Sequence, residues 1–226
     1  MFEIGSVTKV FTALLLADMV RRGEVALDDP VAKYLPAEVK VPTRAGRSIT
    51  LLDLATHTSA LPRLPDNFQP KDPTNPYADY SVEQLYQFIS SYQLTRDIGA
   101  TFEYSNLGAG LLGHALARRA AMDYETLMRS RVLAPLGMSS TAIALSPELQ
   151  SRLTAGHDAQ LRTVPNWDLP TLAGAGALRS TANDLLAFLA VLGQSESSLA
   201  SAMTATLTVR RPVGAAGSDI ALGWMA

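Results

Sequence analysis

Two short groups of residues have the side-chain types and spacing for acyl-transfer chemistry. The first is Ser-Val-Thr-Lys, in which Ser6 and Lys9 stand three positions apart. Residues three apart share one face of a helix, so the Lys9 amine can reach the Ser6 hydroxyl. A serine becomes a good nucleophile when a neighbour removes its proton, and a partly desolvated lysine can do so. Taken alone, however, the four residues fit a helix-capping serine and a solvated lysine better.

The second group, Tyr104-Ser105-Asn106, changes that balance and is the only Tyr-x-Asn in the chain. A phenolic oxygen held beside an ammonium can act as a general base or relay a proton. The Asn106 amide offers a donor and an acceptor, for an amide substrate or for Lys9. The alternative is a buried tyrosine followed by a helix-capping asparagine. If the chemistry is right, Tyr104 lies within hydrogen-bonding reach of Ser6 or Lys9.

Hydrophobic periodicity places both groups at the starts of helices. The pattern predicts a helix from Ser6 to Arg22 and a tightly packed, glycine-rich helix from Asn106 to Ala120. Thr50 with Asp53, and Ser81 with Gln84, have the spacing of capping boxes. Further helices are expected from Thr50 to about His57, from Ser81 to about Tyr92, from Asp123 to about Leu133, from Ser180 or Thr181 to about Leu192, and from Leu199.

Signals for strands are few. They occur at 48–50, 163–167 and 206–211, and residues 222–226 look like the beginning of another strand. Residues 62–80 hold many prolines and little periodicity, which indicates a long surface loop. The sequence therefore predicts a mostly helical chain with too few strands for a full sheet.

Composition narrows the class of protein. The 226 residues suit one large domain or two small ones, with 47% hydrophobic and 18% charged residues. A net charge of -2 argues against nucleic acid as a partner, because binding phosphates requires a basic excess. The chain has no cysteine, and its longest apolar run, 10–20, is too short to span a bilayer. We expect no signal peptide ahead of the first predicted helix.

The two motifs together resemble the serine β-lactamase and penicillin-binding-protein superfamily, specifically the class C β-lactamases with their related esterases and D-alanyl-D-alanine peptidases. Other segments resemble landmarks of that group and follow in the expected order over almost the whole chain. They are Phe2 to Lys9, Leu27-Asp28-Asp29-Pro30-Val31, Ile49-Thr50-Leu51-Leu52 with His57-Thr58-Ser59, Pro135-Leu136-Gly137-Met138, and Ala173 to Leu178 with Ser180-Thr181.

This resemblance implies an acyl-enzyme mechanism in a bacterial hydrolase. Ser6 would be acylated, Lys9 and Tyr104 would move protons, and Asn106 would contact the substrate. The implied substrate is a small molecule with a β-lactam, D-alanyl peptide or ester carbonyl, and no cofactor is implied. The implied fold is α+β, with residues 1–226 forming the mostly helical portion of the β-lactamase/DD-peptidase fold. Its catalytic helix would span about 6–22 and its helical subdomain about 50–205.

The chain also departs from the family pattern. It has no Lys-Thr-Gly or His-x-Gly, the third motif of the family, and Ala60 stands where glycine is usual after His-Thr-Ser. We therefore expect a chain truncated at both ends, with most of the antiparallel sheet and one oxyanion-hole donor missing. Such a donor is worth about 10²–10³ in rate. We also expect an exposed apolar face on the 6–22 helix, and hence marginal stability or self-association.

Other functional interpretations have less support. There is no Gly-x-Ser-x-Gly for an α/β-hydrolase and no His-Glu-x-x-His for zinc, so no metal site is predicted. The Gly-x-Gly-x-x-Gly of Gly108 to Gly113 lacks a βαβ setting, and close helix packing explains it better. His57 and His114 are interpreted as structural residues. Trp167 and Asp168, with Trp224, could line the substrate cleft or simply pack, and packing is the favoured interpretation. A non-catalytic fragment or binding module of the same fold is the competing hypothesis.

Overall fold

The computed structural model describes residues 1–193, 197, 199–213 and 218–225. They form an α+β fold in which helices dominate, and this confirms the predicted fold class. The helices are α1 (Thr8–Arg21), α2 (Leu51–Ala55), α3 (Val82–Ser91), α4 (Asn106–Ala120), α5 (Tyr124–Met128), α6 (Pro147–Ser151), α7 (Ala173–Gly176), α8 (Ala182–Ala190) and α9 (Ala200–Thr208), with 3-10 turns at Gly5–Val7, Val31–Tyr34 and Val191–Gly193 and a π turn at Arg129–Leu133.

The strands of the described residues are two residues long and pair antiparallel in twos. The pairs are β1 (Phe2–Glu3) with β6 (Arg179–Ser180), β2 (Thr43–Arg44) with β3 (Arg47–Ser48), β4 (Gly156–His157) with β5 (Thr163–Val164), and β7 (Arg211–Pro212) with β8 (Asp219–Ile220). The β1–β6 pair aligns Phe2 with Ser180, and so joins the start of α1 to the segment that follows α7.

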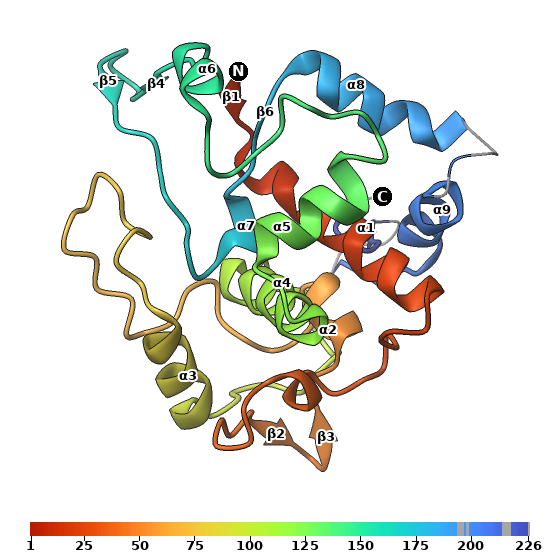
Figure 1. Cartoon of the computed structure of the whole chain (residues 1–226). Helices are drawn as coiled ribbons and strands as arrows, with labels where there is room; N and C mark the ends of the chain where they lie inside the picture. Colours follow the sequence, from red (N-terminus) through yellow and green to blue (C-terminus); the bar gives the residue numbers. More distant parts are fainter. Residues whose placement is uncertain (194–196, 198, 214–217, 226) are drawn as a thin grey trace.

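Helix α1 forms the centre of the core. It crosses the middle of the molecule and packs against α4, α5, α7 and α9 (Figure 1). Phe11, Leu14 and Leu15 are completely buried, as expected for a helix that is apolar on all sides. The predicted exposed face is therefore wrong, because α9 covers it. Self-association through that face loses its physical basis.

Helices α4 and α7 approach each other at glycines. A Cβ atom on Gly113 would lie 2.9 Å from the Cα of Gly174, and one on Gly110 would lie 2.5 Å from the Leu172 side chain. Side chains at these positions would push the two helices apart. This confirms close packing as the reason for the Gly-x-Gly-x-x-Gly pattern, and it fixes the position of α7 beside α1.

Side-chain caps define several helix starts as the sequence predicted. The Thr50 and Asp53 pair and the Ser81 and Gln84 pair form complete capping boxes at α2 and α3. Ser105 caps α4 by accepting a hydrogen bond from the backbone N–H of Gly108. Asn106 is therefore the first residue of α4, held at the end of the helix that faces Ser6 and Lys9.

Three local expectations differ from the structure. Ser6 lies in the 3-10 turn that precedes α1 rather than in the helix itself. Residues 206–208 continue α9 instead of starting a strand, and there the Thr206 hydroxyl donates to the Met203 carbonyl and accepts from the Trp224 indole. Residues 222–225 turn back onto the core and form a single β-bridge, between Ile220 and Met225.

Candidate active site

Ser6 and Lys9 meet at the start of α1. Gly5 has φ +48°, a conformation that side chains disfavour, and it lets the chain turn sharply into the 3-10 segment that holds Ser6. Ser6 is exposed and Lys9 is buried in the first turn of α1. The Lys9 Nζ lies 3.1 Å from the Ser6 Oγ and donates to it. The one-turn spacing thus brings the amine against the hydroxyl, as the sequence predicted.

Three oxygen atoms surround the Lys9 amine. Besides the Ser6 Oγ, it donates to the Asn106 Oδ1 at 2.9 Å and to the main-chain carbonyl of Ala175 at 2.7 Å. Burial, and then the positive charge of Arg63, lower the pKa of Lys9 from 10.5 to about 7. A neutral amine can give its two hydrogens to the amide and carbonyl oxygens, which only accept. Its lone pair then points at the Ser6 hydroxyl.

Tyr104 also contacts the Ser6 hydroxyl. Its phenol donates to the Ser6 Oγ at 2.6 Å, and this confirms the predicted proximity. The Lys9 Nζ lies 4.7 Å from the centre of the Tyr104 ring, and the Arg63 guanidinium lies 5.2 Å from it. The serine oxygen is therefore in contact with both predicted proton-transfer groups.

The His57 ring packs against the Tyr104 ring. The two rings are 4.7 Å apart, and the buried His57 Nδ1 accepts a hydrogen bond from the backbone N–H of Ser105. Burial, together with the charge of Lys9, lowers the pKa of His57 to about 4. The predicted structural role fits these contacts. The ring contact with Tyr104 was not predicted, although the His-Thr-Ser landmark marked the segment.

The Asn106 amide lies between Lys9 and a residue that the sequence did not single out. Its Oδ1 faces Lys9, and its Nδ2 donates to the Tyr77 hydroxyl at 3.0 Å. Tyr77 belongs to the proline-rich loop 62–80, which was interpreted only as a surface loop. The structure therefore brings Ser6, Lys9, Tyr104 and Asn106 together and adds Tyr77 to them.

A cavity of about 120 Å³ opens beside the serine. Tyr77, Trp167 and Leu169 give it one apolar wall. Packing was the favoured interpretation of Trp167, and the structure supports the alternative as well: its ring lies 5.6 Å from that of Tyr77 and lines the cavity. Trp224 does pack, with its indole bonded to Thr206. The remaining lining residues are Glu3, Gly5, Ser6, Asn106, Ala175 and Gly176.

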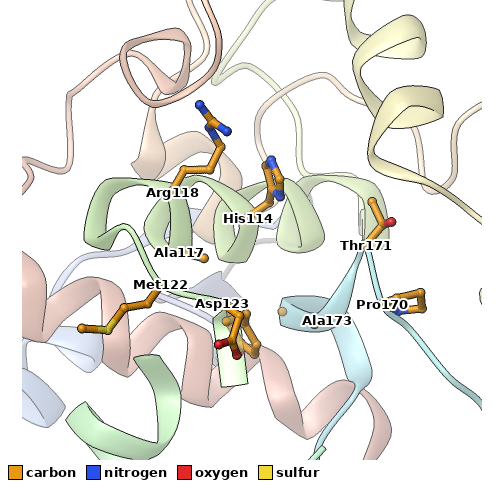
Figure 2. Close-up of a pocket in the computed structure, with 10 residues that line it drawn as sticks. His114, Ala117, Arg118, Met122, Asp123, Pro170, Thr171 and Ala173 are labelled. Atoms are coloured by element: carbon orange, nitrogen blue, oxygen red, sulfur yellow. The ribbon is translucent and has the colours of Figure 1, made fainter. Parts of the chain in front are cut away.

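A second cavity, of about 250 Å³, lies on another side of the α4–α7 contact. Figure 2 shows its lining residues, which come from the C-terminal half of α4, the turn before α5 and residues 170–174. His114 is among them, with its Nε2 hydrogen-bonded to the Tyr86 hydroxyl at 2.7 Å. None of the four predicted site residues lines this cavity.

Over the ranges that the structure describes, no cluster of three or more His, Asp or Glu side chains is placed to hold a metal ion. Among the same residues, no helix combines the length and the apolar content needed to cross a membrane.

Comparison with known proteins places this geometry in context. A family model described as Beta-lactamase matches residues 1–226. The D-alanyl-D-alanine-carboxypeptidase/endopeptidase AmpH of Escherichia coli K12 is 35% identical over 184 residues, which are 81% of this chain and 46% of that protein. A β-lactamase of Pseudomonas fluorescens is 33% identical over 230 residues, covering 99% of this chain and 60% of that protein. The chain thus spans about half the length of the curated relatives it matches.

Solved structures agree with the sequence comparison. A β-lactamase/D-alanine carboxypeptidase from Yersinia pestis, complexed with citrate, superposes with a TM-score of 0.79 at 30% identity, covering 91% of this chain and 58% of that chain. A class C β-lactamase from Rhodobacter sphaeroides gives a TM-score of 0.75 at 32% identity, covering 91% of this chain and 56% of that chain.

Proposed function

Because the chain belongs to the β-lactamase family of serine hydrolases, we propose that Ser6 is its acylated nucleophile. One observation carries the proposal: the exposed Ser6 Oγ lies within hydrogen-bonding distance of both Lys9 and Tyr104 at the edge of a cavity. An isolated capping serine would not need two proton-transfer groups on one oxygen. Residues 1–226 then act as a partial hydrolase domain, with the catalytic helix at α1.

Acylation would begin with proton removal from Ser6. Neutral Lys9 takes the hydroxyl proton while the Ser6 Oγ bonds to the substrate carbonyl carbon. The tetrahedral intermediate then expels its amine or alcohol, and Tyr104 delivers a proton to that leaving group. Lys9 returns its proton to Tyr104. Water next attacks the Ser6 ester and releases the carboxylic acid, restoring the free serine.

The cavity and the relatives both support the proposed substrate class. A β-lactam, a D-alanyl peptide and an ester each present a carbonyl that Ser6 can attack and a side group that the Tyr77–Trp167 wall can hold. Asn106, at the cavity edge, has an amide that can hydrogen-bond an amide substrate. We expect slow turnover from the 226 residues, since no Lys-Thr-Gly or His-x-Gly is present to line the far side of the site.

Covalent labelling tests the proposal. A fluorescent penicillin and a fluorescent phosphonate should each label the chain at Ser6, and Ser6→Ala should abolish the label. Hydrolysis of nitrocefin and of p-nitrophenyl acetate then separates lactam from ester turnover. Absence of labelling by both probes, in a folded protein, would favour the competing hypothesis of a non-catalytic binding module.

A further inference from the structure

The amide of Asn106 is held at both of its ends. Its Oδ1 accepts from the Lys9 Nζ at 2.9 Å, while its Nδ2 donates to the Tyr77 hydroxyl at 3.0 Å. We propose that Tyr77 is a positioning residue that keeps the Asn106 oxygen against Lys9. This inference rests on the proposed function and adds to it a residue outside the two motifs.

The orientation of this amide matters because of how the Lys9 lone pair is directed. The neutral amine has two hydrogens, and the Ala175 carbonyl and the Asn106 Oδ1 accept them. With both acceptors in place, the remaining lone pair faces the Ser6 hydroxyl. If the amide rotates away, one N–H has no fixed acceptor and the lone pair is no longer directed at Ser6.

The hydroxyl of Tyr77 is suited to prevent that rotation. Tyr77 is buried, so an Nδ2 group that lost this acceptor would face an aromatic surface. An unsatisfied, partly buried donor is unfavourable, and the amide would turn toward water in the cavity to regain a partner. The contact with Lys9 would then be lost.

Packing fixes the position of the Tyr77 ring. Its centre lies 4.9 Å from that of Phe68 and 5.6 Å from that of Trp167. Close by, loop 62–80 is joined to the segment that holds Trp167, because Asn75 and Asp168 form reciprocal hydrogen bonds of 3.0 and 2.8 Å. Tyr77 is therefore a rigid anchor for Asn106, although it lies in a proline-rich loop.

The pKa of Lys9 should report on the contact between its amine and the Asn106 oxygen. An amide oxygen stabilises the charged amine more than the neutral one, so its loss lowers the Lys9 pKa further. The other titratable or charged groups around the amine are Arg63, Tyr104 and His57, and none of them changes when the Tyr77 hydroxyl is removed.

The first measurement is the Lys9 titration by NMR with labelled lysine side chains. The chain has four lysines, and Lys9→Arg identifies the signal of Lys9. Tyr77→Phe should lower the Lys9 pKa by about 0.3–1 unit, Asn106→Ala should lower it comparably, and the double variant should add nothing to Asn106→Ala. Tyr80→Phe is the matched control. It also removes a tyrosine hydroxyl from loop 62–80, but that hydroxyl contacts Asn67 and not Asn106.

The second measurement is the rate of Ser6 labelling by the penicillin probe. Tyr77→Phe should slow the saturating rate about tenfold with little change in the half-saturating concentration, whereas Tyr80→Phe should match wild type. An unchanged Lys9 pKa in Tyr77→Phe would overturn the inference. So would a double variant in which Tyr77→Phe slows labelling of the Asn106→Ala protein as much as it slows labelling of wild type. If wild type is not labelled at all, the proposed function fails, and the titration still decides the role of Tyr77.

Discussion

At the scale of single residues, the proposed role of Lys9 depends on the burial of its amine. A lysine with its usual pKa of 10.5 would be charged at neutral pH and unable to accept the Ser6 proton. Burial and the charge of Arg63 lower that pKa to about 7. The same burial makes the charged amine unfavourable in the folded protein, so the low pKa that the proposed mechanism requires lowers the stability of the fold.

Replacing Lys9 should therefore stabilise the protein. Between pH 7 and 10.5 the unfolded chain binds more protons at this lysine than the folded chain does, so wild-type stability rises with pH across that window. Lys9→Met should raise the free energy of unfolding at pH 6.5 by roughly 2–4 kcal/mol, and by less at pH 9.5. Urea unfolding at both pH values measures this, with exposed Lys71→Met as the control. An equal effect of Lys9→Met at both pH values would contradict the cause given for the pKa.

The sequence predicted the motif residues better than their surroundings. Ser6 and Lys9 are linked by one helical turn, a local relation that the spacing shows directly. Tyr104 and Asn106 were linked to them through the family resemblance. Tyr77 was missed, because its hydroxyl reaches Asn106 only through the tertiary path of loop 62–80, and no periodicity encodes that path.

At the scale of elements, the contact between α4 and α7 places the Ala175 carbonyl beside Lys9. Gly113 and Gly174 allow the two helices to approach, and α7 then follows α1 closely. The Thr12 hydroxyl adds to this arrangement by donating to the Gly174 carbonyl at 2.8 Å. The site therefore depends on backbone positions that carry no catalytic side chain.

A methyl group at Gly113 should disturb both fold and site. In Gly113→Ala the new Cβ would lie 2.9 Å from the Gly174 Cα and 3.0 Å from the Tyr124 ring, so α7 must shift. We expect a loss of roughly 1–3 kcal/mol in stability, together with slower Ser6 labelling as the Ala175 carbonyl moves. Gly108→Ala is the control in the same helix, where the nearest atom is the Ser105 hydroxyl at 3.3 Å. Equal stabilities and labelling rates in the two variants would contradict this role of α7.

Helix boundaries were predicted well where polar caps define them, as at Thr50, Ser81 and Asp123. Of the strand expected at 206–211, residues 206–208 are helical, because packing of α9 against α1 outweighed the β-propensity of Thr206 and Thr208, whereas Arg211 begins β7. Ala60 also has a physical explanation. Its φ of +63° lies in the region that glycine favours, which accounts for the usual glycine at this place in the resembled family.

At the scale of the whole molecule, one hydrophobic core includes α1 and the segments that return to it from the end of the chain. The expectation of an exposed α1 face assumed that only a large sheet could cover it. Instead α9 packs on α1, and the turn at 222–224 bonds back to Ala55 and Thr206. The burial of α1 depends on contacts with residues far away in the sequence, so the local pattern of α1 could not reveal it.

Two histidines, buried His57 and partly buried His114, should make the fold sensitive to acid. Burial lowers the pKa of both His57 and His114 from 6.5 to about 4, so between these pH values the unfolded chain binds more protons. Stability should therefore fall as the pH drops from 6.5 toward 4, by a few kcal/mol in total. His114→Gln should reduce the pH dependence by roughly half, because one of the two histidines is removed. Thermal unfolding at pH 4.5 and 7 tests this, and an identical pH dependence in wild type and His114→Gln would exclude His114 as a contributor.

The central claim is that neutral Lys9 activates Ser6, and the pH dependence of Ser6 acylation tests it most directly. The saturating rate of labelling by the penicillin probe, measured from pH 5 to 9, should rise with pH and level off above an apparent pKa near 7. Lys9→Ala should nearly abolish the labelling while α1 stays intact, because alanine favours helix. A rate in wild type that does not change between pH 5 and 9, or a comparable rate in Lys9→Ala, would contradict the account.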